Sequence, residues 1–210
     1  MITLYDSLGS GNAYKVRLVL SQLAVPFQAI EFNTFDGSTR TPQFLAKNPN
    51  GRVPTVRLED GTYLAESNAI MWYFAEGSAL APATRLERAQ TLQWLFFEQY
   101  SHEPYIAVVR AWKHFVAKLS PLQEMELPER VKRGYAALAV MEQHLASRDF
   151  FVGGRYGLAD IALYAYTHVA PEGDFELGRF AKIRSWLARV AAQPGHVPIT
   201  AQPPVAAAES

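Results

Sequence analysis

Apolar and polar positions change their spacing once along the chain, near residue 77. Up to that point, alternating or apolar stretches predict strands, and apolar residues three or four positions apart predict helices. The predicted strands are residues 2–5, 27–32, 53–58 and 63–64, and the predicted helices are residues 13–24, 42–46 and 68–75. The turn at Asp60-Gly61 joins the last two strands as a hairpin. The resulting order, β-α-β-α-β-β-α, predicts an α/β domain over residues 1–76.

Beyond residue 76 every pattern is helical. Small residues and a proline mark a linker at residues 77–86. A long helix begins near Arg85, and we expect Pro104 to kink or break it. Later helices are predicted from residues with helical spacing: Val131, Tyr135, Leu138, Met141 and Leu145; Leu158 to His168; and Phe180, Ile183, Leu187 and Val190. We therefore expect an all-α domain over residues 87–199 and a flexible tail over residues 200–210.

The composition excludes more kinds of functional site than the length of 210 residues does. Twenty basic and twenty acidic side chains cancel, so the charge gives no reason to expect a nucleic acid or an anionic membrane as a partner. The chain shows neither a secretory signal nor an apolar run of about 20 residues, so we expect a cytoplasmic protein. The absence of cysteine excludes a disulfide, a thiolate metal site and a cysteine nucleophile. Any thiol chemistry must use the sulfur of a ligand.

A small polar loop, Gly9-Ser10-Gly11-Asn12, follows the first strand and opens the first helix. A hydroxyl at such a turn can donate a hydrogen bond to a sulfur near the helix N-terminus. Both the hydrogen bond and the helix end favour the thiolate and lower the pKa of the thiol. Ser10 and Asn12 could equally be helix caps, which are common. The residues alone leave both interpretations open.

Two further segments stand at the start of a strand and of a helix. A cis Val53-Pro54 bond would turn the backbone N–H and C=O of Val53 outward, where an extended peptide could pair with them. A proline at the first residue of a strand needs no function, however. At Glu66-Ser67 the serine and the helix N-terminus could hold a carboxylate and the acidic side chain an ammonium group. The alternative is a helix cap at Ser67 beside a solvated Glu66.

In this order and on this scaffold, the segments resemble the cytosolic glutathione transferase family, in particular bacterial members with a serine or asparagine in the active-site loop. The matching segments are the Ser10/Asn12 loop, residues 44–54 (FLAKNPNGRVP), the Asp60-Gly61 hairpin and residues 64–70 (LAESNAI). The resemblance implies a thioredoxin-like N-terminal domain and an all-α C-terminal domain. It also implies a homodimer that uses glutathione as co-substrate and needs no metal.

The resemblance assigns the sulfur of glutathione to the loop after the first strand. Ser10 matches the hydroxyl that activates the sulfur in the serine-type classes, and Asn12 matches an asparagine that contacts it in some bacterial classes. Tyr5 is a rival activator, because other classes use a tyrosine. It ranks below Ser10 because it lies within the strand.

The rest of the tripeptide is assigned to the two later segments. Val53, with Pro54 in the cis form, would pair with the cysteinyl backbone, and Glu66-Ser67 would hold the γ-glutamyl end. Lys47 and Arg52 would bind the glycine carboxylate, although the classes differ at this point. All these residues belong to the first 76.

In the helical half, the second substrate should lie between the domains. The candidates for its pocket are Tyr105, Arg110, Trp112 and Tyr166, for which plain packing is the ordinary alternative. Asp160 matches a family position and is expected to cap its own helix. His102-Glu103 is not followed by a second histidine at position 106, so no metal site is predicted.

The resemblance implies a glutathione S-transferase that activates the thiolate for conjugation to small electrophiles, a detoxification activity. Glutathione-dependent reduction of peroxides or disulfides is an alternative, because the same thiolate serves both reactions. A non-enzymatic interaction module with the same fold is a further alternative. Such relatives often lose the activating hydroxyl or the Glu-Ser pair, and this chain keeps Ser10 and Glu66-Ser67.

Overall fold

The computed structural model, which describes residues 1–204, has the predicted order of strands and helices in its first part. Four strands form a mixed sheet in the order β2-β1-β3-β4. The strands are β1 (Ile2–Asp6), β2 (Phe27–Glu31), β3 (Thr55–Arg57) and β4 (Tyr63–Ala65). β1 runs parallel to β2 and antiparallel to β3, and β3 runs antiparallel to β4. This is the sheet of a thioredoxin-like domain.

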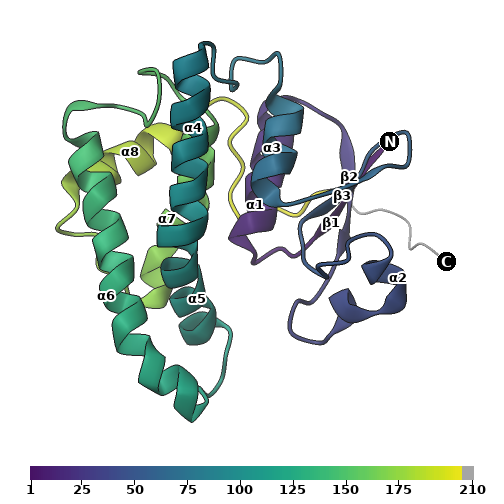
Figure 1. Ribbon diagram of the computed structural model, residues 1–210, viewed down its shortest axis with the longest axis horizontal. Helices are drawn as coiled ribbons and strands as arrows, with labels where there is room; N and C mark the ends of the chain where they lie inside the picture. Colours follow the sequence, from purple (N-terminus) through teal and green to yellow (C-terminus); the bar gives the residue numbers. More distant parts are fainter. Residues whose placement is uncertain (205–210) are drawn as a thin grey trace. The chain divides into compact units, whose positions relative to one another are not determined.

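Helices cover both faces of this sheet. Figure 1 shows α1 (Gly11–Gln22) and α3 (Ser67–Ala75) on one side of the strands and α2 (Pro42–Leu45) on the other. Side chains alternate across a strand, so neighbouring residues of β1 face different helices. Leu4 belongs to a buried cluster with residues of α1 and α3. Tyr5 packs instead against Phe44 of α2.

Two predicted boundaries are shifted for identifiable reasons. α1 begins at Gly11, two residues before the predicted start, because the Ser10 side chain accepts a hydrogen bond from the backbone N–H of Ala13 and caps the helix. β3 begins at Thr55 instead of residue 53. The carbonyl of Arg52, just before it, accepts side-chain hydrogen bonds from Asn48 and Thr55.

The second part of the chain is helical, as predicted. Its α-helices are α4 (Arg85–Phe97), α5 (Glu103–His114), α6 (Pro121–His144), α7 (Leu158–Thr167) and α8 (Ala181–Ala191). The break expected at Pro104 lies one turn earlier, in the π-helical turn η2 (Glu98–His102), and Pro104 stands in the first turn of α5. None of the helices within residues 1–204 is long and apolar enough to cross a membrane.

Asp160 ties α7 to its surroundings. Its carboxylate accepts hydrogen bonds from the backbone N–H groups of Gly157 and Phe151 and from the indole of Trp186. The bond to Gly157 is the predicted cap of its own helix. Burial raises the pKa of Asp160 to about 7, against the three N–H donors.

The structure divides the chain in a different way from the predicted domains. One unit comprises residues 1–78 and the segment from residue 194 on, and the other comprises residues 79–193. The last described residues belong to the first unit because they bind α1: Tyr14 donates to the carbonyl of Val197, and Arg17 to those of Ile199 and Ala201. Figure 1 shows this yellow segment beside α1. Residues 205–210 of the predicted tail lie outside the described residues.

Candidate functional site

The pairing of the strands brings three polar segments to one edge of the sheet. In the antiparallel register Tyr5 lies opposite Thr55, and Thr55 lies opposite Ala65. β1 and β4 therefore end, and β3 begins, at the same edge. The Ser10/Asn12 loop, Val53-Pro54 and Glu66-Ser67 all leave the sheet there, although they are far apart in the sequence.

Ser10 is the N-cap of α1. Its Oγ accepts the hydrogen bond of the Ala13 N–H at 3.3 Å, and its own backbone N–H donates to the carbonyl of Ser7 at 2.8 Å. A serine hydroxyl that accepts a hydrogen bond still carries a proton that it can donate. The capping interpretation of Ser10 is confirmed, and it leaves the hydroxyl able to serve a sulfur as well.

Asn12, Ser67 and Lys15 form a cluster that joins the first turns of α1 and α3. Asn12 Oδ1 accepts hydrogen bonds from Lys15 Nζ at 2.9 Å and from Ser67 Oγ at 3.3 Å. Lys15 also donates to Ser67 Oγ at 3.5 Å and to Asn68 Oδ1 at 3.4 Å. Lys15 was not among the predicted site residues. The signal was present, because Lys15 follows Asn12 by three residues, which places both on one side of the helix.

The N-cap of α3 is Glu66 and not Ser67. The prediction that Ser67 caps α3 is wrong: Ser67 is the first helical residue and Glu66 is the N-cap, whose carbonyl accepts from the Ile70 N–H. Glu66 has φ of 67° and ψ of 111°, a backbone conformation that a residue with a Cβ rarely adopts. Its side chain is exposed and Ser67 is buried. The turn thus separates an exposed carboxylate from a hydroxyl held within the cluster.

The loop before β3 is fixed by Asn48. Its buried side-chain amide donates to the Arg52 carbonyl at 2.9 Å and to Thr55 Oγ1 at 3.0 Å. The Val53-Pro54 bond is cis, as expected. Val53 is half-buried and the Arg52 side chain is exposed.

Tyr5 and Lys47 lie on the α2 side of the sheet. The ring of Tyr5 is buried among Phe32, Phe44 and Tyr63. Lys47 Nζ lies 5.5 Å from the centre of the Tyr5 ring, as a cation–π contact. α1 and α3 cover the other face, so Tyr5 points away from the face on which Asn12 and Ser67 meet.

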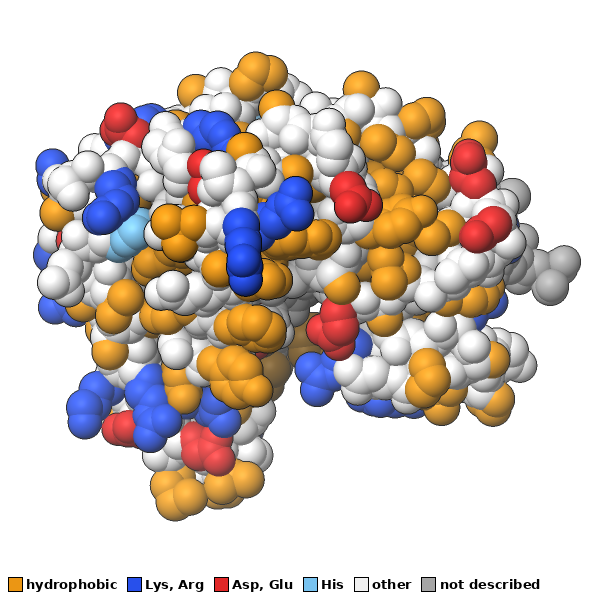
Figure 2. Space-filling model, turned by 45° about the horizontal axis from the view of Figure 1, so that its top comes forward, with side chains coloured by type: hydrophobic (Ala, Val, Ile, Leu, Met, Phe, Trp, Pro, Cys, Tyr) orange, Lys and Arg blue, Asp and Glu red, His pale blue; other side chains and the backbone are white. Residues whose placement is uncertain are grey.

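The four candidates for the second substrate, all in the helical unit, do not share one environment. Arg133 Nη1 donates to the hydroxyl of Tyr105 at 3.0 Å, and the Arg130 guanidinium stacks 5.0 Å from the ring of Trp112. Both arginines come from α6, and Figure 2 shows basic side chains gathered above the tip at which α6 begins. Arg110 and Tyr166 are buried.

Arg110 has a strong partner of its own. Its Nε and Nη2 both lie 2.7 Å from Glu172 Oε2, in the 3₁₀ turn η4 (Ala170–Gly173). Its charge is therefore already paired with a carboxylate. The structure brings Tyr105 and Trp112 to the arginines of α6, and Arg110 to η4.

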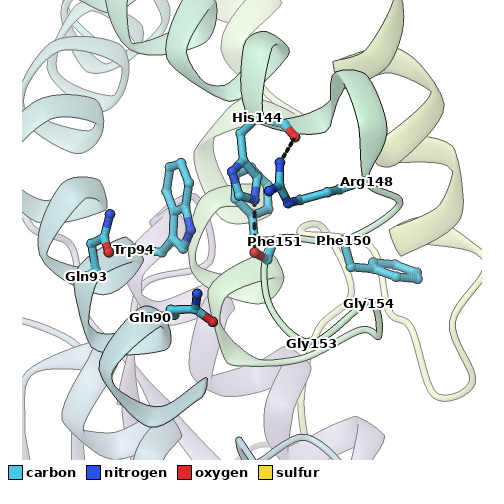
Figure 3. A pocket seen from close by; sticks show the side chains of 9 residues that line it. All are labelled: Gln90, Gln93, Trp94, His144, Arg148, Phe150, Phe151, Gly153 and Gly154. Atoms are coloured by element: carbon cyan, nitrogen blue, oxygen red, sulfur yellow. Dashed lines mark hydrogen bonds between the residues drawn. The ribbon is translucent and has the colours of Figure 1, made fainter. Parts of the chain in front are cut away.

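A separate cavity of about 220 Å³ lies within the helical unit. Its aromatic wall consists of Trp94, His144 and Phe151, with Gln90 and Arg148 at the sides (Figure 3). His144 Nε2 donates to the Phe151 carbonyl at 2.9 Å, and burial lowers the pKa of this histidine. None of the residues that line this cavity was predicted as a site residue. Among residues 1–204 no group of three or more histidine and acidic side chains could hold a metal ion.

A thioredoxin-like unit followed by a helical unit, with cis-proline and helix N-termini at one edge of the sheet, defines a class of two-domain proteins. Residues 9–76 match the glutathione S-transferase N-terminal domain, and residues 100–194 match the glutathione S-transferase C-terminal domain. The chain is 48% identical to a possible glutathione S-transferase from Rhodopseudomonas palustris, with a TM-score of 0.93 over 99% of this chain and 93% of that one. The protein belongs to the glutathione S-transferase family.

Two other relatives have a name or a bound ligand that indicates their own chemistry. The disulfide-bond oxidoreductase YfcG of Escherichia coli is 28% identical over 202 residues, 92% of each chain. The glutathione transferase URE2P6 of Phanerochaete chrysosporium, in complex with oxidized glutathione, is 25% identical with a TM-score of 0.82 over 92% of each chain. The chain spans only about half the length of the Ure2 proteins of yeasts that it matches, 50% for that of Meyerozyma guilliermondii.

Proposed function

We propose that the protein binds glutathione at the sheet edge and holds its sulfur as a thiolate for attack on a second substrate. The observation that carries this proposal is the contact between Asn12 and Ser67. The two residues are 55 positions apart, and their side chains are hydrogen-bonded at 3.3 Å. The loop proposed for the sulfur and the turn proposed for the γ-glutamyl end are therefore neighbours, within the reach of one tripeptide.

The remaining contacts follow from the same edge. Ser10 donates a hydrogen bond from its hydroxyl to the sulfur while it caps α1, and Asn12 donates from its amide N–H. Val53 pairs with the cysteinyl backbone. Ser67 and the exposed Glu66 take the carboxylate and the ammonium group of the γ-glutamyl end. Arg52, whose side chain is exposed, and Lys47 remain the candidates for the glycine carboxylate.

The hydroxyl of Ser10 and the N-terminus of α1 can supply the free energy that is needed to ionise the thiol at neutral pH. A free thiol with a pKa of about 8.5 is only a few per cent ionised at pH 7. Lowering the pKa by about two units takes a differential interaction of about 2.7 kcal/mol. One hydrogen bond from a hydroxyl to an anion, ~1.5–3 kcal/mol, and a helix N-terminus, ~0.3–1 kcal/mol, are of that size.

The thiolate supports two reactions. In conjugation its sulfur forms a bond to an electrophilic carbon, and the leaving group departs with its bonding electrons. In disulfide reduction two glutathiones are oxidised to their disulfide, while the substrate disulfide takes two electrons and two protons. The similarity to YfcG and to a glutathione transferase that holds oxidized glutathione favours the second reaction as an alternative. Because this chain has no cysteine, every sulfur in either reaction comes from the substrates.

For the second substrate we propose Tyr105 and Trp112 as contacts, because both are partly exposed, and we keep the buried Arg110 and Tyr166 as further candidates. We also propose that the protein is a cytoplasmic homodimer that removes electrophiles. Three apolar side chains at successive turns of α4 and η2 are exposed: Leu92 by 42%, Phe96 by 62% and Tyr100 by 77%. Such a stripe fits a second copy of the chain better than water.

The test is a calorimetric titration with glutathione, followed by assays with an aryl halide, a hydroperoxide and a small disulfide. We expect binding, together with turnover of at least one of the three substrates. Binding with turnover of the peroxide or the disulfide alone would assign the protein to the reductases. The absence of glutathione binding would contradict the proposal and favour an interaction module.

A further inference from the structure

Lys15 is a lysine whose whole side chain is buried. Its relative exposure is 0%, and its ammonium group lies among three neutral acceptors, on Asn12, Ser67 and Asn68. Taking an ammonium group out of water is costly, and the long stem of a lysine usually lets the charge reach the surface. A lysine whose ammonium group stays buried therefore has a structural or functional role, and it does not serve solubility.

The shortest of these hydrogen bonds determines the orientation of Asn12. Lys15 Nζ lies 2.9 Å from Asn12 Oδ1, and Ser67 Oγ donates to the same oxygen at 3.3 Å. An ammonium group carries only donors, so the atom that faces it must be the oxygen of the amide and not the nitrogen. The two N–H bonds of the planar amide are then directed away from Lys15.

We propose that Lys15 is a positioning residue, which holds the carbonyl end of Asn12 so that the amide N–H bonds face the sulfur of bound glutathione. This inference rests on the proposed function. An asparagine with no such partner could rotate and present either its oxygen or its nitrogen to the sulfur. The oxygen would repel a thiolate, whereas the N–H group stabilises it. The hydrogen bond from Lys15 prevents the orientation in which the oxygen of Asn12 faces the sulfur.

The same geometry would also suit a purely structural role, in which Lys15 joins α1 to α3. The two roles differ in what they change. A structural link affects the free energy of unfolding. A positioning residue changes the ionisation of the bound thiol, and it does so only while Asn12 is present. The effects of Lys15 and Asn12 on the thiol must then be non-additive.

The experiment uses the full chain with Lys15→Met, Lys15→Arg, Asn12→Ala and the double variant Lys15→Met/Asn12→Ala. The ultraviolet absorbance of the thiolate is titrated against pH in each complex with glutathione. Binding of glutathione is also measured at a pH low enough to keep the thiol protonated. Lys15→Arg is the conservative control, since it keeps a charged donor. Circular dichroism shows whether each variant is folded, and Lys15→Gln replaces Lys15→Met if the latter does not fold.

We expect Lys15→Met to raise the pKa of the bound thiol by about one unit, which is a tenfold loss of thiolate at a fixed pH below that pKa. Binding of the protonated thiol should change by less than about threefold. Lys15→Arg should restore most of the wild-type pKa. Asn12→Ala should give the same shift as Lys15→Met, and the double variant should add nothing further.

Three outcomes would overturn the inference in different ways. An unchanged thiol pKa in Lys15→Met, or in Lys15→Gln, would show that Lys15 only joins the helices, and the proposed function would survive. Additive shifts in the double variant would mean that the charge of Lys15 acts on the sulfur directly, without Asn12. A wild-type protein that binds no glutathione would remove the proposed function itself.

Discussion

Arg17 Nε lies 3.4 Å from Asp6 Oδ2, and both side chains are buried beneath the proposed active-site loop. Asp6 ends β1, and its Oδ1 accepts from the backbone N–H of Ser7 at 2.8 Å. Arg17 Nη2 donates to the carbonyl of Leu8 at 2.7 Å. The pair therefore holds the first residues of the loop that leads to Ser10, so the position of that loop depends on buried charges in α1 and β1.

The two members of this pair should differ in the cost of their removal. Arg17 also donates to three carbonyls, those of Leu8, Ile199 and Ala201, so its charge keeps partners without Asp6. We expect Asp6→Asn, which can still accept from Ser7, to change the free energy of unfolding by less than about 1 kcal/mol at neutral pH, because burial disfavours the charge that it removes. Arg17→Met leaves a buried carboxylate and three carbonyls without their donor, and should cost about 3–5 kcal/mol. Urea denaturation measures both. Equal losses would contradict the argument.

Asp6 should make the protein less stable as the pH rises through about 6. Burial raises the pKa of Asp6 from 3.8 to about 6, against the charge of Arg17. Between these values the folded protein holds a proton that the unfolded chain has released. The contribution of Asp6 to the free energy of unfolding is therefore complete below pH 3.8 and is lost as the pH rises to about 6. Asp6→Asn cannot titrate, so its denaturation midpoint should vary less with pH in this window. Parallel curves for the two proteins would show that Asp6 titrates elsewhere.

Ser10 combines a helix cap with the proposed activation of the sulfur, and two substitutions separate these roles. Ser10→Ala should lower the free energy of unfolding by about 1 kcal/mol, whereas Ser10→Gly should cost only a few tenths, because glycine is a tolerable N-cap. Both lack the hydroxyl, so both should raise the pKa of the bound thiol by about a unit. Thiolate absorbance and urea denaturation give the two quantities. A thiol pKa that neither substitution changes would assign the activation to Asn12.

The exposed stripe on α4 and η2 predicts the state of assembly. Phe96, exposed by 62% in the middle of the stripe, should lie in the contact between two copies. Phe96→Glu would place a charge there and should convert a dimer into a monomer in analytical ultracentrifugation. Leu122→Glu is the matched control, because Leu122 is exposed by 59% on α6, outside the stripe. A wild-type monomer, or a dimer that survives Phe96→Glu, would exclude this stripe as the interface.

Much of the fold could be predicted from the sequence because its signals are local. The strand order, the Asp60-Gly61 turn and the helical second half each follow from apolar spacing or from turn residues within a few positions. α6 was predicted only from Val131 on, although it begins at Pro121. Pro128 interrupts the apolar spacing inside this helix, and the start signal that Ser120 and Gln123 give as a capping box went unused. The predicted end of the helical domain, residue 199, also differs from the structure, in which the helical unit ends at residue 193. The segment that follows belongs to the first unit because side chains of α1 hold it.

The sequence by itself determined the chemistry that is available: a chain without cysteine, with a hydroxyl and an amide at the opening of its first helix and a Glu-Ser pair before its third. Only the tertiary structure decided which of these groups meet. Ser67 reads as a helix cap, yet it donates to Asn12, and Lys15 reads as a surface charge, yet it is buried between two helices. The physical reason is that local propensity depends on neighbours along the chain. A buried polar group, in contrast, takes its partners from whichever element the fold packs against it.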